Sequence, residues 1–179
     1  MVFGLFRTRN HNRVIVDRQY AALSAAARMP DLYARLDVPD TVMGRFEMLS
    51  IVMILFFRRT RASETSGQEL AQEIVDAFFQ DIDHSIRELG IGDNGVPKRM
   101  KKFAGMFYGR LESYAAAMDG NDRLALAAAL RRNIYPDQGE GAPSMEGLAE
   151  WMVAAERHLS GVSETEIATG SATLPQPEV

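Results

Sequence analysis

The stretch Gly90-Ile-Gly-Asp-Asn-Gly-Val-Pro-Lys-Arg-Met-Lys-Lys-Phe103, which leads on to Phe107-Tyr-Gly-Arg110, places a glycine-rich loop directly before a predicted helix. Pro97 suits the first turn of this helix, because the amide hydrogen that proline lacks would have no partner there. We predict that the helix runs to about Met118. Apolar residues recur along it every three or four positions and form one stripe that we expect in the core: Met100, Phe103, Phe107, Leu111, Tyr114 and Met118.

The opposite face of this helix is basic at its start, where Lys98, Lys101 and Lys102 lie, and smooth in its middle, where Gly105 and Gly109 lie. A glycine inside a helix costs roughly 1 kcal/mol relative to alanine, so a helix that keeps two of them is expected to need close approach there. Two interpretations remain open. Either a neighbouring helix of the same chain packs over the glycines, or the face is exposed and receives a partner.

The glycine loop itself, residues 90–95, invites comparison with phosphate-binding loops, because helix N-termini bind anions. It lacks the Gly-Lys-Ser/Thr ending of a P-loop, and a helix rather than a strand precedes it. We therefore interpret it as a tight turn between two helices, in which the glycines supply positive φ and Asp93 or Asn94 caps the second helix.

Helical periodicity dominates the rest of the chain, and no convincing strand pattern interrupts it. The apolar run from Met48 to Phe57 is about half as long as a bilayer crossing requires, so we predict a buried central helix. The fold class is all-α, a single compact bundle of about six to seven helices. The expected helices cover residues 12–28, 32–36, 40–59, 68–89, 97–118, 123–134 and 144–160.

The chain divides into three predicted parts. Residues 1–11 form a flexible N-terminal segment, residues 12–160 form the helical domain, and residues 161–179 form a polar tail that we expect to be disordered. The N-terminal segment resembles a short interfacial membrane anchor, in which apolar residues enter the headgroup region and arginines meet anionic lipid. The predicted membrane-contact residues are Phe3, Leu5, Phe6, Arg7 and Arg9.

Composition excludes several classes of protein. The 179 residues contain no cysteine, which removes disulfides, zinc–thiolate sites and cysteine nucleophiles. The net charge of −4 argues against a constitutive nucleic-acid binder, although Lys98, Arg99, Lys101 and Lys102 leave a ribosome- or RNA-binding module as an alternative. An apolar start followed by arginines is the reverse of a secretory signal, so we expect a cytoplasmic protein.

One further motif, Asp81-Ile-Asp83-His84, raises the alternative of a metal-dependent lipid or isoprenoid enzyme. A di-iron bundle site would need two Glu-x-x-His motifs, and the isoprenoid enzymes use paired Asp-rich motifs, whereas this chain offers one. We expect instead a solvated acidic face that pairs with the basic helix. No nucleophile–His–acid combination can be argued, so we predict neither a metal, a cofactor nor enzymatic activity.

Two separated motifs resemble the ubiquinol–cytochrome c chaperone family. One is Gly92-Asp-x-Gly-Val-Pro-Lys-x-Met-Lys-Lys102 followed by Phe107-Tyr-Gly-Arg-Leu-x-x-Tyr114, and the other is Val38-Pro-Asp-Thr41 followed by Gly44-Arg-Phe-Glu47. The resemblance implies an all-helical assembly factor that binds newly made cytochrome b and supports biogenesis of the cytochrome bc1 complex. Mitochondrial members act with a partner assembly protein near the ribosomal tunnel exit.

Without a transit peptide, the chain resembles a bacterial member that acts at the inner face of the cytoplasmic membrane. A membrane-protein client offers apolar helices with charged ends, so we predict an apolar groove with charged rims between the helices that follow Pro39 and Pro97. The predicted client-binding residues are Arg45, Lys98, Lys101, Lys102, Gly105, Tyr108 and Gly109.

Overall fold

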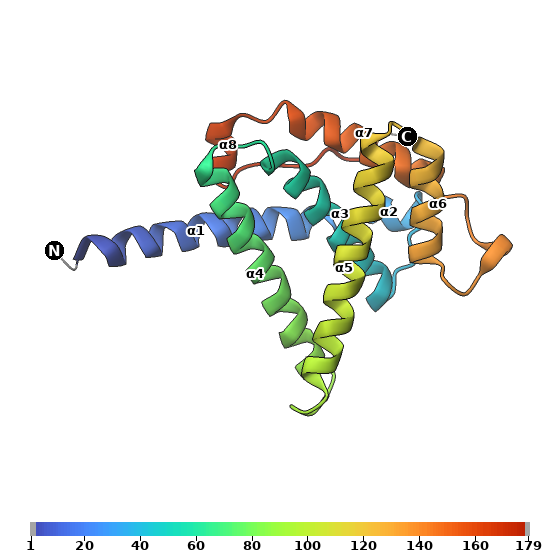
Figure 1. Ribbon diagram of the computed structural model, residues 1–179, viewed down its shortest axis with the longest axis horizontal. Coiled ribbons are helices and arrows are strands. Elements are labelled where there is room, and N and C mark those ends of the chain that lie inside the picture. The colour runs from blue at the N-terminus through green and yellow to red at the C-terminus, as the bar shows by residue number, and fades with distance from the viewer. Residues whose placement is uncertain (1–2, 178–179) are drawn as a thin grey trace.

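The computed structural model describes the backbone of residues 3–177 and the side chains of residues 12–177. Within these residues the regular structure is entirely helical, which confirms the all-α prediction (Figure 1). The helices are α1 Phe3–Ala26, α2 Pro30–Ala34, α3 Val42–Thr60, α4 Thr65–Glu88, α5 Val96–Asp119, α6 Arg123–Ile134, the 3-10 turn η1 Gly139–Gly141, α7 Glu146–Ser160 and α8 Glu164–Ala168. No helix in this described part combines the length and apolar character needed to cross a membrane.

Helix α3 is the central helix, as its apolar middle predicts. It contacts α1, α4, α5, α6 and α7, and its residues 50–56 are all buried. The helix begins where the Thr41 hydroxyl accepts a hydrogen bond from the Gly44 amide at 3.0 Å. Glycine is required at position 44, because a Cβ there would collide with the Pro39 carbonyl oxygen. The local sequence therefore fixes both the start of α3 and the approach of the chain that precedes it.

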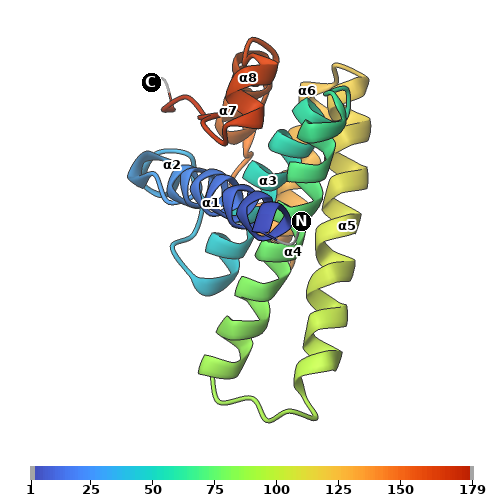
Figure 2. The same ribbon diagram turned by 90° about the vertical axis from the view of Figure 1, so that its left-hand side faces the viewer.

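Helices α4 and α5 form a long antiparallel hairpin that projects beyond the other helices (Figure 2). Its aromatic residues pack across the hairpin, with the Phe78 and Phe107 ring centroids 5.1 Å apart. At the tip, Gly90 has a φ of 78°, as the turn interpretation predicts, whereas Gly92 and Gly95 do not have a positive φ. Asp93 does not cap α5 as we expected, since its carboxylate accepts a hydrogen bond from Arg87 at 2.6 Å and Gly95 is the N-cap.

The start of α1 differs from the expected boundary, because its backbone is helical from Phe3 rather than from residue 12. The side chains of residues 1–11 lie outside the described part of the structure. Membrane contact through Phe3, Leu5, Phe6, Arg7 and Arg9 therefore stays a prediction.

The C-terminal segment, which we expected to be disordered from residue 161, is folded as far as residue 177. Ser163 and Glu166 form a capping box at the start of α8, and Ile167 and Ala172 are buried. The buried Gln19 amide donates to the Ala172 carbonyl at 2.8 Å and accepts from the Ala172 amide at 3.0 Å. Scattered apolar residues and side-chain contacts to the backbone hold this segment, and neither gives a periodic signal in the sequence.

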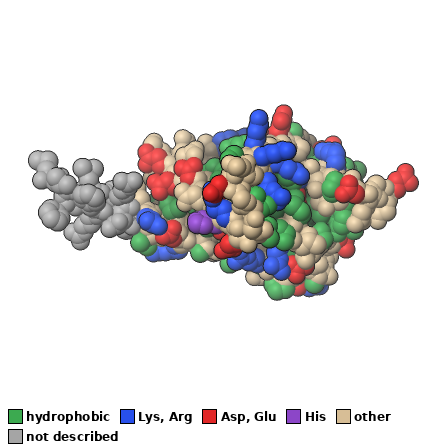
Figure 3. Space-filling view, turned by 90° about the horizontal axis from the view of Figure 1, so that it is seen from below, with side chains coloured by type: hydrophobic (Ala, Val, Ile, Leu, Met, Phe, Trp, Pro, Cys, Tyr) green, Lys and Arg blue, Asp and Glu red, His purple; other side chains and the backbone are tan. Residues whose placement is uncertain are grey.

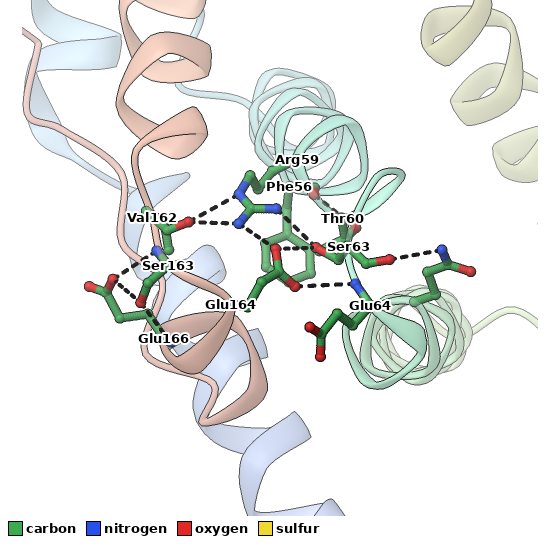
Figure 4. A network of polar contacts seen from close by, with 10 residues as sticks. Phe56, Arg59, Thr60, Ser63, Glu64, Val162, Ser163, Glu164 and Glu166 are labelled. Atoms are coloured by element: carbon green, nitrogen blue, oxygen red, sulfur yellow. Dashed lines mark hydrogen bonds and ion pairs between the residues drawn. The ribbon is translucent and has the colours of Figure 1, made fainter.

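Arg59 joins the C-terminal segment to the loop between α3 and α4 (Figure 4). Its guanidinium donates to the Val162 carbonyl, to the Glu164 carboxylate and to the Ser63 hydroxyl, at 2.7, 2.7 and 2.9 Å. The two segments are about a hundred residues apart in sequence, so this arginine attaches the C-terminal segment to the end of α3.

Candidate functional site

A hollow of about 310 Å³ opens where four helices meet beside the half of the hairpin that leads to its tip. Because this half points downward in Figure 1, we call the hollow the basal groove. Its walls come from the end of α1, the start of α3, the second half of α4 and the start of α5. The side of the molecule seen in Figure 3 carries hydrophobic side chains with lysines and arginines around them. The apolar lining of the groove consists of Ala27, Val42, Phe46, Leu49, Ile82, Ile86, Leu89 and Phe103.

The floor of the groove is built around Phe46 on α3. Its ring meets the Phe103 ring edge to face, with the centroids 4.9 Å apart, and the Arg110 guanidinium lies 5.7 Å from its centroid. Arg110 also donates to both carboxylate oxygens of Glu47, and both side chains are buried. Arg110 follows the basic residues Lys98, Lys101 and Lys102 on the same helix, but the structure places it inside the bundle.

The rim of the groove is unusually apolar for a surface. Val42 is 69% exposed and Leu89 is 66% exposed, although Leu89 continues the apolar stripe of α4, in which Ile74 and Phe78 are buried. Leu89 is exposed because the end of α4 extends beyond the helices that cover its earlier turns. Exposed apolar side chains that gather around a hollow mark a binding surface more often than isolated ones do.

Three arginines surround this rim. Arg45 pairs with Asp40 at 2.7 Å, and this ion pair lowers the pKa of the Asp40 carboxyl. Arg28 and Arg99 have no ion-pair partner within the described residues. Among the described lining residues Asp81 is the one carboxylate, and it accepts a hydrogen bond from the Tyr20 hydroxyl at 2.9 Å. The groove is therefore apolar inside and positively charged at its edge.

The residues predicted to bind a client divide between two surfaces. Arg45 lines the basal groove, whereas the others lie along the exposed face of α5: Lys98, Lys101, Lys102, Gly105, Tyr108 and Gly109. A Cβ added at Gly105 or Gly109 would meet nothing within 4 Å, so no described helix packs over the glycines. Tyr108 is 54% exposed and flanks the Phe79 ring, with the centroids 6.3 Å apart.

Sequence reasoning missed the part of the groove that α1 and α4 contribute. The sequence predicted a helix that ends at Leu89, but it singled out neither Ile86, Leu89 nor Arg28 as part of a site. The signal that marks the groove is an apolar stripe that continues to the last residue before a tight turn, at Gly90. Because the chain turns back directly after such a stripe, the last apolar residue of the helix extends beyond the neighbouring helices and stays exposed.

The acidic motif of α4 is engaged in local contacts. The Asp83 carboxylate accepts a hydrogen bond from Arg87 at 2.7 Å, which lowers its pKa, and Asp81 accepts from Tyr20. Among the described residues the acidic face forms no ion pair with the lysines of α5, contrary to our expectation, and its Asp83 pairs with Arg87 on the same helix. In the part of the chain that the structure describes, no three His, Asp or Glu side chains are grouped to hold a metal ion.

A second hollow, of about 460 Å³, lies along α6. It has one strongly exposed apolar residue at its edge, Leu124, and Arg131 in its wall is engaged by the Gly139 carbonyl at 2.6 Å. Its lining includes Tyr135 but no packed ring pair like Phe46 and Phe103, and none of the described lining residues is a predicted site residue. The basal groove is therefore the better candidate site.

Comparison with known proteins identifies relatives of both the sequence and the fold. The crystal structure of the Cbp3 homolog from Brucella abortus is 47% identical in sequence and matches with a TM-score of 0.87, over 98% of this chain and 97% of that chain. Ubiquinol-cytochrome-c reductase complex assembly factor 1 of Xenopus laevis is 22% identical over 135 residues, which cover 75% of this chain and 67% of that protein.

The corresponding protein of Mus musculus is 21% identical over 150 residues, which cover 84% of this chain and 50% of that protein. The chain thus spans about half the length of this mammalian relative. The family model described as ubiquinol-cytochrome C chaperone matches residues 34–174, which include both sequence motifs and the groove walls on α3, α4 and α5. On this match, the chain belongs to the ubiquinol-cytochrome C chaperone family.

Proposed function

We propose that this chain is a non-enzymatic chaperone that binds newly made cytochrome b and supports assembly of the cytochrome bc1 complex. Its family and the names of its curated relatives, which are assembly factors of the ubiquinol-cytochrome c reductase complex, support this assignment. The observation that carries it is the basal groove, which combines an aromatic floor, exposed apolar rim residues and surrounding arginines.

The chemistry of the groove suits a membrane-protein client. Before insertion, such a client exposes apolar helices of about 20 residues whose ends carry polar and charged groups. An apolar hollow covers part of such a helix, and charged groups at the rim remain in water, so neither partner buries an unpaired charge. Arg99 lines the groove, and its neighbours Lys98 and Lys101 lie on the exposed face of α5, so the two surfaces meet at the first turn of this helix.

Site-specific crosslinking in living cells tests this function directly. Photoreactive amino acids at Leu49, Arg99 and Tyr108 should give adducts with cytochrome b, whereas one at the exposed Arg157 on α7 should give none. Absence of cytochrome b adducts at all three positions would overturn the proposal. Deletion of the gene should also lower the haem b spectrum of the assembled bc1 complex.

A matched pair of substitutions separates the groove from the rest of the surface. Val42 and Leu124 are both apolar, both lie in the first turn of a helix and are 69% and 72% exposed. Val42→Asp places a carboxylate on the rim of the groove and should reduce bc1 assembly in cells that depend on this chain. Leu124→Asp should leave assembly unchanged. Equal effects of the two substitutions would contradict a role of the groove.

We propose further that the protein acts at the inner face of the bacterial cytoplasmic membrane as a peripheral protein. Support comes from the apolar and basic composition of residues 1–11, which is typical of an interfacial segment. A variant with Phe3→Ser and Phe6→Ser should shift from the membrane fraction to the supernatant. An unchanged distribution would refute the contact.

A further inference from the structure

The unpaired charge at the basal groove suggests which client segment it accepts. Arg28 on the chain after α1 and Arg99 on α5 both line the groove, both are exposed, and neither has an ion-pair partner within the described residues. The nearby carboxylates are engaged, since Asp81 accepts from Tyr20 and Asp40 pairs with Arg45. The edge of the groove therefore has two guanidinium groups available for acidic groups of a partner.

The length of the groove follows from its wall on α4. Lining residues on this helix run from Asp81 to Leu89 and share one face, as Ile82, Ile86 and Leu89 do. At a rise of 1.5 Å per residue this wall is about 12 Å long, which accommodates about two turns of a guest helix. The hollow is concave and has an aromatic floor, which fits a helix better than it fits the flat surface of a bilayer.

We infer that the basal groove binds about two turns of an apolar helix whose flanking residues are acidic, and that Arg28 and Arg99 select these acidic flanks. This inference rests on the proposed function, because it names the class of client segment that the same groove accepts. A helix with basic flanks is disfavoured, because its cations would face Arg28 and Arg99, which have no ion-pair partner in the described chain, whereas Asp40 already pairs with Arg45. Charge complementarity of this kind contributes specificity more than affinity.

Peptide binding to the purified full chain tests the inference. The probes are three fluorescein-labelled helical peptides of about 14 residues with the same leucine–alanine face, flanked at both ends by Glu, by Gln or by Lys. Fluorescence anisotropy should show that the Glu peptide binds about fivefold more tightly than the Gln peptide, with the Lys peptide weakest. The preference should fall as salt is added.

Paired variants assign the preference to the two arginines. The variant with Arg28→Gln and Arg99→Gln should bind the Glu and Gln peptides equally while it still binds the apolar face. The control with Arg132→Gln and Arg157→Gln removes two exposed arginines elsewhere that also lack ion-pair partners in the described chain, and it should keep the preference.

Three outcomes would overturn the inference. They are equal binding of the Glu and Gln peptides by the unaltered protein, a preference that survives loss of both arginines, and binding through these arginines to phosphatidylglycerol vesicles but to none of the peptides. The cellular crosslinks to cytochrome b remain a separate test. An acidic preference without these adducts would refute the proposed client and support the selectivity, and adducts without the preference would do the reverse.

Discussion

Arg110 on α5 donates to both carboxylate oxygens of Glu47 on α3, and the two side chains are 8% and 2% exposed. This contact joins the two sequence motifs that carry the family resemblance. Burial raises the pKa of the Glu47 carboxyl, even though the neighbouring Arg110 favours its charged form. Arg110 also lies over the Phe46 ring, so the ion pair supports the floor of the basal groove.

Removal of one partner of this pair should be strongly destabilising. Arg110→Met leaves the Glu47 carboxylate buried without its cation, and we expect a loss of about 3–5 kcal/mol in the free energy of unfolding, measured by urea denaturation. Without the Arg110 charge the Glu47 pKa rises further, so the folded variant holds its proton more tightly than the unaltered protein does. The loss should therefore shrink as the pH is lowered toward 4.5, the usual pKa of the group.

The double variant Glu47→Leu with Arg110→Met serves as the control. It removes both charges and fills their place with apolar groups, so its stability should return to within about 1–2 kcal/mol of the unaltered protein. If the double variant were as unstable as Arg110→Met, shape rather than uncompensated charge would explain the loss.

Two glycines should respond in opposite ways to substitution by alanine. Gly44→Ala places a Cβ against the Pro39 carbonyl oxygen, so the start of α3 must shift, and we expect a loss of about 2 kcal/mol or more. Gly105→Ala meets nothing within 4 Å on an exposed helix face and should stabilise the protein by about 0.5–1 kcal/mol. Thermal unfolding of both variants checks this, and a loss at Gly105 would mean that another element covers it.

The helices themselves were predictable because local signals specify them. The apolar run of α3, the cap at Thr41 and the turn at Gly90 each depend on residues that are neighbours in the sequence. The core stripe of α5 was also correct in its centre, where Phe107 and Tyr114 are buried. At such positions the helical period alone decides which side chain faces inward.

The basal groove and the C-terminal segment were not predictable, because each depends on contacts between distant residues. Gln19 and Ala172 are 153 positions apart, and no local pattern indicates that the Gln19 side chain will form hydrogen bonds with the backbone of Ala172. The groove likewise needs the end of α1 beside the end of α4. The groove also depends on the exposure of Leu89, which lies beyond the helices that cover the earlier turns of α4. The sequence indicates only that Leu89 continues an apolar stripe.

The C-terminal segment should lose its attachment when Gln19 is truncated. Gln19→Ala leaves the buried amide and carbonyl of Ala172 without their partners, which should cost about 2–3 kcal/mol and speed proteolysis after residue 168. Mass spectrometry of the fragments gives the cleavage sites. Gln80→Ala is the control, since that exposed glutamine makes no side-chain hydrogen bond in the described chain. Equal cleavage of both variants would contradict this role of Gln19.

The Arg59–Glu164 contact should make the attachment of the C-terminal segment to α3 sensitive to acid. The Arg59 guanidinium lowers the pKa of the Glu164 carboxyl below its usual 4.5, with the Glu64 amide and the Ser63 hydroxyl contributing. A lowered pKa stabilises the folded state fully above pH 4.5 and loses this effect as pH falls through the folded value. Glu164→Gln should therefore lower Tm more at pH 7 than at pH 3. Glu88→Gln, at an exposed residue without an ion-pair partner in the described chain, should change Tm at neither pH. A Tm difference for Glu164→Gln that is the same at both pH values would show that the carboxylate charge does not hold this contact.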